Sequence, residues 1–203
     1  GDGFDDLIVG APFGDDGGTD AGAAYVVYGG ATGSNSTINL KGLTPGQGFI
    51  LQGDAAEDRA GWSVSSAGDV NGDGFDDLIV GADLGDDGGA NAGEAYLVYG
   101  GATGSNIDLS SLTAAQGFII QGDVAGDQAG RSVSSAGDVN GDGFDDLIVG
   151  AFRGDDKGTD AGEAYVVYGG ATETESMTSV SRVGTGSADN FTGNAGDDIF
   201  TGI

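Results

Sequence analysis

The chain contains no cysteine and no histidine among its 203 residues. These absences exclude disulfides, thiolate metal sites, Cys or His nucleophiles and histidine general bases. No run of 18 apolar residues is present, so the sequence predicts no transmembrane helix and no membrane insertion. No signal peptide is visible, and the chain begins at Gly1 inside a repeated motif. We therefore expect a piece of a longer chain, a processed product or a subunit.

Positive charge and proline are also scarce. Six basic residues stand against 33 acidic ones, which gives a net charge of −27. Such a surface would repel nucleic acid and anionic membranes. The chain has two prolines and 44 glycines, as expected for many short strands joined by tight turns. Regular apolar runs separate the acidic segments, so the acidity does not indicate disorder.

One phrase of fifteen residues dominates the sequence. Gly-Asp-Val-Asn-Gly-Asp-Gly-Phe-Asp-Asp-Leu-Ile-Val-Gly-Ala occupies 68–82 and returns unchanged at 137–151. Its last eleven residues open the chain at 1–11. Each copy places an acidic, glycine-rich loop directly before an apolar strand.

The spacing of the oxygen side chains predicts calcium binding. Calcium takes six to eight hard oxygen ligands at about 2.3–2.6 Å, including carboxylates and backbone carbonyls. Glycines between the ligands let the short loop curl around one point. The predicted ligands in the second copy are Asp69, Asn71, Asp73, the Phe75 carbonyl and Asp77, and in the third copy Asp138, Asn140, Asp142, the Phe144 carbonyl and Asp146. The first copy retains Asp2, the Phe4 carbonyl and Asp6.

Two alternatives to this calcium loop are an EF-hand and a turn that binds nothing. An EF-hand needs a bidentate glutamate at position 12 and a following helix. Position 12 is Val80 or Val149 here, and the next residues are Gly and Ala. A simple Asx turn would leave several carboxylates close together without a cation, although Asp, Asn and Gly favour turns by themselves.

The phrase belongs to a longer repeat of about 70 residues. β-Branched and aromatic runs between Gly/Asp clusters predict strands. These fall at 61–67 and 130–136; at 6–11, 77–82 and 146–151; at 23–28, 94–99 and 163–168; and at 48–52 and 117–121. Four short strands in each repeat predict an all-β fold of β-propeller blades with four antiparallel strands. We expect about three blades, the outer two incomplete, with repeats at 1–59, 60–128 and 129–172.

The end of the chain has a different composition. Residues 173–183 are rich in Ser, Thr and Glu and predict a linker. Two nine-residue segments follow, at 184–192 and 193–201, each with Gly first, Asp sixth and Phe eighth. This period is typical of calcium-binding parallel β-rolls, so we expect a short β-roll-like tail over 184–203.

Smaller acidic patterns recur as well. Asp54 and Asp58 return as Asp123 and Asp127, and the pattern favours caps of a turn between blades over a metal role. Gly-Asp-Asp recurs at 14–16, 85–87 and 154–156 and favours a solvated acidic turn over a second cation site.

The repeat resembles the bacterial FG-GAP proteins, which are related to the integrin α-subunit propeller. The resemblance lies in Gly61-Trp62-Ser63-Val64, the loop 69–77 and Gly81-Ala82, with Gly10-Ala11-Pro12 in the first copy. Ala60 and Ala129 stand where that family has Phe. The resemblance implies a propeller whose calcium loops join the first and second strands of each blade on one rim. The tail resembles repeats-in-toxin segments, which implies an exported bacterial protein.

These observations lead to a non-enzymatic, secreted calcium-binding module for adhesion or extracellular surface assembly. We expect Ca²⁺ as the bound ion and an extracellular protein or glycan as partner, with self-association or further blades of a longer chain. An accessory domain of an extracellular hydrolase and an inert calcium-stiffened spacer are the alternatives. Every repeated acidic cluster is explained by calcium or a turn, so no carboxylate pair stands out for acid–base catalysis.

Overall fold

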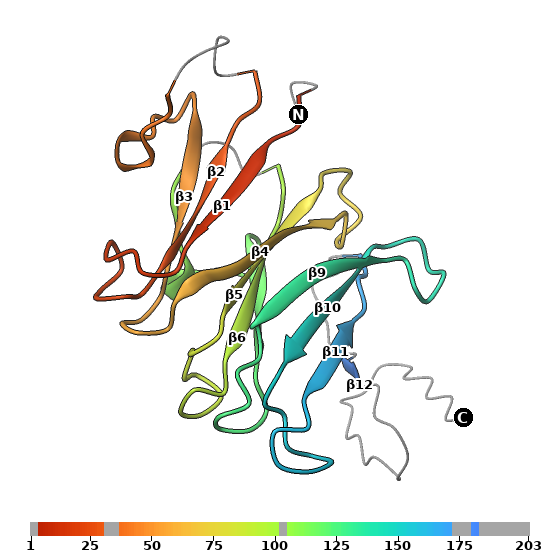
Figure 1. Ribbon diagram of the computed structural model, residues 1–203. Helices are drawn as coiled ribbons and strands as arrows, with labels where there is room; N and C mark the ends of the chain where they lie inside the picture. The colour runs from red at the N-terminus through yellow and green to blue at the C-terminus, as the bar shows by residue number, and fades with distance from the viewer. Residues whose placement is uncertain (1–3, 31–36, 102–104, 172–179, 183–203) are drawn as a thin grey trace.

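The computed structural model describes residues 4–30, 37–101 and 105–171, together with the backbone of 180–182. This part of the chain is built from short strands and two single-turn 3₁₀ helices (Figure 1). The strands are β1 (Leu7–Ala11), β2 (Ala23–Val27), β3 (Gly48–Gln52), β4 (Ala60–Gly68), β5 (Asp77–Ala82), β6 (Glu94–Val98), β7 (Ile107–Asp108), β8 (Gly117–Gln121), β9 (Ser132–Gly137), β10 (Asp146–Ala151), β11 (Glu163–Val167) and β12 (Val180–Arg182). The 3₁₀ helices are η1 (Leu40–Gly42) and η2 (Leu109–Ser111). No helix in this part of the chain is long and apolar enough to cross a membrane.

The strands form three sheets of four strands each. Their orders are β1-β2-β3-β7, β4-β5-β6-β8 and β9-β10-β11-β12. The second sheet contains the four predicted strands of one repeat in chain order, so it is a complete antiparallel blade. The expected all-β propeller architecture is therefore confirmed, and the predicted bounds of β3, β5, β8 and β10 agree with the structure.

The three sheets repeat the same register. Val9 pairs with Tyr25, Val80 with Tyr96 and Val149 with Tyr165. The regularity follows from the repeated Leu-Ile-Val and Ala-Tyr runs, because β-branched and aromatic side chains favour the pleated, packed surface of a sheet. Equivalent residues of the three repeats can therefore be compared directly.

Two strands were not predicted. The third sheet differs from the expected incomplete blade, since β12 pairs antiparallel with β11 and supplies a fourth strand. β12 lies within 173–183, where the sequence predicted a linker. In the first sheet, β7 runs parallel to β3, with Leu51 opposite Ile107. Strand pairing uses backbone N–H and C=O groups, so segments outside the repeat pattern can complete a sheet.

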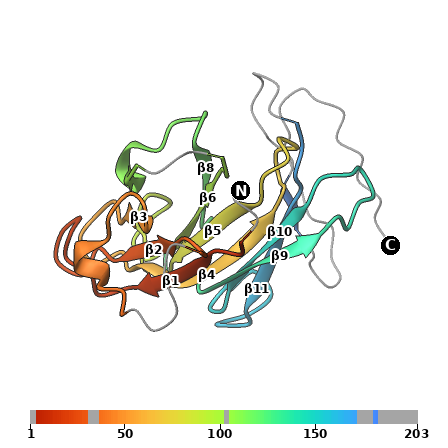
Figure 2. The same cartoon turned by 90° about the horizontal axis from the view of Figure 1, so that it is seen from above.

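The hydrophobic core lies between the sheets, with the second sheet in the middle (Figure 2). Between the first and second sheets, Val26 and Leu51 pack with Val80 and Tyr96. Between the second and third sheets, the buried cluster includes Ile79, Leu97, Leu147, Val149 and Val167. The second sheet is thus stabilised by its neighbours through both of its faces, and each outer sheet through one.

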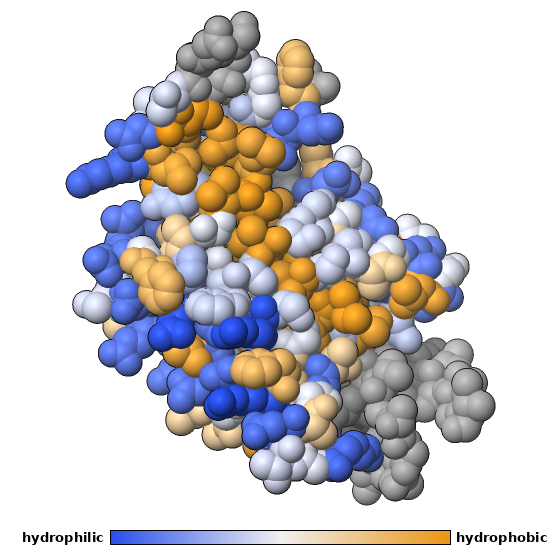
Figure 3. Space-filling model, viewed as in Figure 1, coloured by the Kyte–Doolittle hydropathy of each residue, from blue (hydrophilic) through white to orange (hydrophobic). Residues whose placement is uncertain are grey.

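Identical residues become exposed where a neighbouring sheet is absent among the described residues. Val9 is 39% exposed, whereas its equivalents Val80 and Val149 are fully buried. Ile148 is 38% exposed, whereas Ile79 is fully buried. Hydrophobic side chains accordingly gather on the surface over β1–β3 (Figure 3). The two outer sheets therefore each present an uncovered apolar face.

Candidate metal centre

The repeated acidic loops occupy the positions implied by the resemblance. Loop 69–77 joins β4 to β5, the first and second strands of the second blade, and loop 138–146 joins β9 to β10 in the third. The loops are neighbours in space, because the Asp69 N–H donates to the Asp145 carboxylate at 2.9 Å. The Asp145 N–H donates in return to the Asp69 carbonyl at 3.2 Å. They therefore lie on the same rim of the molecule.

The first aspartate organises each loop by accepting several backbone N–H groups. Asp69 Oδ1 accepts from Gly72 and Asp73 at 2.8 and 3.0 Å, and its Oδ2 accepts from Gly74 at 3.0 Å. Asp138 accepts from the three equivalent residues of the third repeat at 2.6–3.1 Å. Gly72 and Gly74 have φ of 77° and 87°, a region in which side chains other than glycine are strained.

The hydrogen bonds in the middle of the loop are also the same in both copies. Asn71 Oδ1 accepts from the Asp73 N–H at 2.9 Å, and its Nδ2 donates to Asp73 Oδ2 at 3.0 Å. Asn140 and Asp142 make the same two bonds at 2.9 and 2.7 Å. The N–H of Phe75 donates to Asp73 Oδ1 at 2.9 Å, and Phe144 does so to Asp142 at 3.0 Å. The two sequence copies thus fold into two geometric copies.

The last aspartate of each loop is buried and ties the loop to the sheet. Asp77 is fully buried and accepts from Val70 N–H at 3.0 Å and Gly100 N–H at 2.8 Å. Asp146 is likewise buried and accepts from Val139 and Gly169 N–H at 2.8 and 2.9 Å. Burial raises the pKa of Asp77 to about 6, and the two N–H donors oppose part of this rise. A cation would favour the charged form of this carboxylate.

The first loop is described only in part. Asp6 accepts from the Gly29 N–H at 2.9 Å, which reproduces the anchor seen at Asp77 and Asp146. Phe4 is 62% exposed. Asp2 lies outside the described residues, as does the predicted tail 184–203.

The tightest groups of carboxylates lie elsewhere. Within the described part of the chain, three carboxylates have oxygens within 4.8 Å of one another at Asp54, Asp58 and Glu94, and again at Asp123, Asp127 and Glu163. The loop aspartates instead direct their oxygens to N–H groups of their own loops. Sequence reasoning singled out the aspartates of these clusters but missed both glutamates. The sequence signal that could have revealed them is the recurrence of a glutamate at the start of an otherwise apolar strand, at Glu94 and Glu163.

Burial raises the pKa values of carboxylates in both clusters. Asp58 is 4% exposed, and burial together with the charge of Asp54 raises its pKa to about 8. Glu94 is fully buried, and burial raises its pKa to about 7 against the opposing hydrogen bond from Tyr96. Burial likewise raises the pKa of Asp127 to about 6, with Asp155 adding to the effect. Like charges held together out of water disfavour ionisation unless a cation is bound.

The donor chemistry of both kinds of site fits a hard cation. Each complete loop offers three aspartates, one asparagine amide oxygen and one backbone carbonyl, which are calcium ligand types. Carboxylate and carbonyl oxygens also suit magnesium and manganese, whereas thiolate and imidazole ligands are absent from the chain.

Comparison with known proteins identifies the repeat. The family model described as "FG-GAP repeat" matches residues 1–27, 60–98 and 129–167, together more than half of the chain. The chain is 31% identical over 160 residues to Integrin alpha-PS2 of Drosophila melanogaster, which covers 76% of this chain and 11% of that protein. It is 34% identical over 160 residues to Integrin alpha-5 of Xenopus laevis, covering 74% of this chain and 13% of that protein.

A third relative covers more of the chain. Integrin alpha pat-2 of Caenorhabditis elegans is 30% identical over 178 residues, which is 86% of this chain and 14% of that protein. The chain thus spans less than a sixth of the length of each of these integrin chains. The matched segments contain the acidic loops and the strands on either side of them. This chain belongs to the FG-GAP repeat family and is an integrin-alpha-like β-propeller protein.

Proposed function

We propose that this chain is a secreted, non-catalytic, calcium-binding propeller module for adhesion or extracellular surface assembly. The observation that carries the calcium proposal is the repeated loop geometry, in which Asp69 and Asp138 order the loop and buried Asp77 and Asp146 anchor it. Two loops with the same hydrogen bonds on one rim are expected where the same ligand is bound twice.

Each complete loop would hold one Ca²⁺. The ligands would be Asp69, Asn71, Asp73, the Phe75 carbonyl and Asp77, and their equivalents Asp138, Asn140, Asp142, the Phe144 carbonyl and Asp146. The bound ion would neutralise the acidic loop and hold the first and second strands of a blade together. Asp2, the Phe4 carbonyl and Asp6 offer fewer than six oxygens, so the first loop would bind poorly by itself.

Calorimetric titration with Ca²⁺ tests this assignment. We expect Asp73→Ala and Asp142→Ala each to remove one bound ion per chain, because each loses a predicted ligand from one loop. Asp76→Asn removes an exposed charge within loop 69–77 that is not a predicted ligand, and it is the control for Asp73→Ala. Unchanged stoichiometry in both alanine variants would overturn the loop assignment.

The adhesion proposal is supported by the similarity to three integrin alpha chains. A net charge of −27 disfavours nucleic acid as a partner and leaves an extracellular protein or glycan as the expected one. Binding of the full chain to immobilised matrix proteins and glycans in calcium tests this proposal. Failure to bind any of them would favour an inert spacer, and enhancement of a hydrolase in cis would favour an accessory domain.

The organisation of the parent protein is also a proposal. We infer propeller blades over 1–172, with repeats at 1–59, 60–128 and 129–172, followed by 173–183 and a calcium-binding repeats-in-toxin-like tail at 184–203. The nonapeptide period of that tail supports a bacterial, exported protein. Three sheets are fewer than the four to eight blades of typical propellers, so further blades or a second copy would complete the ring.

A further inference from the structure

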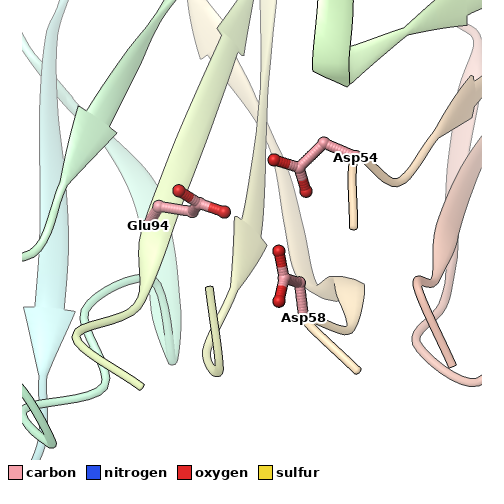
Figure 4. A group of neighbouring side chains, drawn as sticks. All are labelled: Asp54, Asp58 and Glu94. Atoms are coloured by element: carbon pink, nitrogen blue, oxygen red, sulfur yellow. The ribbon is translucent and has the colours of Figure 1, made fainter. Parts of the chain in front are cut away.

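The cluster formed by Asp54, Asp58 and Glu94 is distinct from the calcium loops. The carboxylate oxygens of the three residues lie within 4.8 Å of one another, and the side chains point toward a common centre (Figure 4). Asp54 and Asp58 lie in the connection between β3 and β4, which leads from the first sheet to the second, and Glu94 begins β6. The cluster therefore joins the link between two blades to the third strand of the following blade.

Glu94 has one carboxylate oxygen that lacks any partner. The side chain is fully buried, and the Tyr96 hydroxyl donates to its Oε1 at 2.7 Å. Its Oε2 is buried and makes no hydrogen bond. A buried oxygen of this kind costs free energy of folding unless it binds something, because it has lost its water. Since Glu94 faces Asp54 and Asp58, the missing partner must satisfy several carboxylates together (Figure 4).

The neighbouring basic residue does not supply the missing charge. The Arg59 guanidinium lies 5.4 Å from the ring centroid of Phe13 and 5.8 Å from that of Trp62. Arg131 pairs with Asp83 and Arg153 with Asp160, and neither ion pair involves Asp54, Asp58 or Glu94. The three carboxylates must therefore share protons or hold a cation.

The arrangement recurs between the second and third sheets. Asp123 and Asp127 lie in the connection between β8 and β9, and Glu163 begins β11. The Tyr165 hydroxyl oxygen lies 2.6 Å from a Glu163 oxygen, as the Tyr96 hydroxyl lies beside Glu94, and 2.7 Å from an Asp123 oxygen. Asp127 is 2% exposed, and its buried Oδ2 makes no hydrogen bond.

The backbone around the two clusters is repeated as well. The Asp58 carbonyl accepts from the Leu84 N–H at 3.3 Å, and the Asp127 carbonyl accepts from the Arg153 N–H at 3.2 Å. In the first repeat Ala23 stands at the position of Glu94 and Glu163. Glu94 and Glu163 each face a pair of aspartates from the preceding connection.

We propose that Asp54, Asp58 and Glu94 bind a Ca²⁺ ion between the first and second blades, and that Asp123, Asp127 and Glu163 bind another between the second and third. Three carboxylates from two chain segments match the preference of calcium for hard oxygen ligands, and water would complete its coordination. In each cluster the tyrosine hydroxyl bonds one glutamate oxygen. At Glu94 the other oxygen, Oε2, has no hydrogen-bond partner and would face the ion. At Glu163 the other oxygen, Oε1, accepts from the Asp156 N–H at 3.0 Å. An ion in either cluster would connect two consecutive blades. An ion in an acidic loop such as 69–77 would instead connect two strands of the same blade.

Calcium titration of the full chain with the variant Glu94→Gln tests the proposal. Glu57→Gln is the matched control, because Glu57 is exposed in the same connection and the substitution is chemically identical. We expect Glu94→Gln to bind one fewer Ca²⁺ per chain than wild type, while Glu57→Gln keeps the wild-type stoichiometry. In a chelator, Glu94→Gln should melt at or above the wild-type temperature, since it removes a buried charge. In millimolar calcium it should melt below wild type.

Equal stoichiometry in wild type and Glu94→Gln would overturn the proposal. Greater stability of Glu94→Gln at every calcium concentration would also overturn it and would assign the cluster to shared protons. If this variant does not fold, anomalous diffraction from wild-type crystals soaked in Tb³⁺ decides, because a peak among the three carboxylates supports the site and its absence contradicts it. Asp73→Ala separates this inference from the loop proposal, since it alters a loop and leaves the interblade cluster intact.

Discussion

At the scale of single residues, the buried aspartates Asp77 and Asp146 do the most to join loop and sheet. Each accepts one N–H from its own loop and one from the residue two positions after the neighbouring strand. The equivalent Asp6 makes the latter bond as well. A carboxylate at this position therefore serves both the fold and the proposed ion.

Asp77→Asn should lower the free energy of unfolding by about 2 kcal/mol in calcium. An asparagine amide keeps one acceptor oxygen, so one of the two buried N–H donors would face an NH₂ group instead. Urea denaturation measures the effect. Asp76→Asn changes an exposed neighbour and should stay within about 0.5 kcal/mol of wild type. An equal loss in the free energy of unfolding for the two variants would contradict a special stabilising role of the buried Asp77.

At the scale of elements, the second strand of the first two blades lies very close to the start of the following blade. A Cβ atom added to Gly81 in β5 would overlap the carbonyl oxygen of Gly130, and one added to Gly10 in β1 would overlap that of Gly61. Gly150 has the same sequence context in β10 but would meet only the Ser132 side chain at close range. The requirement for glycine therefore arises from the packing of adjacent blades.

Gly81→Ala should destabilise the protein by about 1–3 kcal/mol, because the backbone of the following blade cannot move away without loss of packing. Gly150→Ala is the matched control and should cost less, since a serine hydroxyl can rotate. Thermal melting of the two variants compares them directly. Equal melting temperatures would contradict the close blade contact at Gly81.

At the scale of the whole molecule, the uncovered faces of the outer sheets predict association. Val9 on the first sheet and Ile148 on the third are exposed where their equivalents are buried. β1 also forms one edge of its sheet, and an unpaired edge offers backbone groups to another strand. A head-to-tail contact between these two faces would extend the ring or continue as a filament.

Sedimentation at micromolar concentration in millimolar calcium tests this expectation. Wild type should associate, and Val9→Lys or Ile148→Lys should each shift it to monomer, because either variant places a charge on one half of the contact. Val124→Lys is the control, since Val124 is 38% exposed in the connection between the second and third sheets and its equivalent Ala55 is exposed as well. A stable, cooperatively folded wild-type monomer would contradict the expectation.

The sequence by itself determined the features that depend on short-range chemistry. Apolar runs such as 77–82 and 117–121 predicted strands, and the Asp/Asn/Gly spacing of 69–77 predicted the loop between β4 and β5. These predictions succeeded because residue preferences and turn chemistry act within a few positions of the chain. The repeat then extended each local prediction to its copies.

Only the tertiary structure decided which distant residues meet. Glu94 lies 36 or more positions after Asp58 and Asp54, and the packing of one blade on the next brings the three together. The same packing makes Val80 buried and Val9 exposed, although both stand in the same sequence phrase. β7 and β12 joined their sheets through backbone pairing, which residue preferences outside the repeat did not reveal. The number and order of neighbouring sheets therefore set the burial and the acidic clusters, whereas the repeated phrase set the strands and loops.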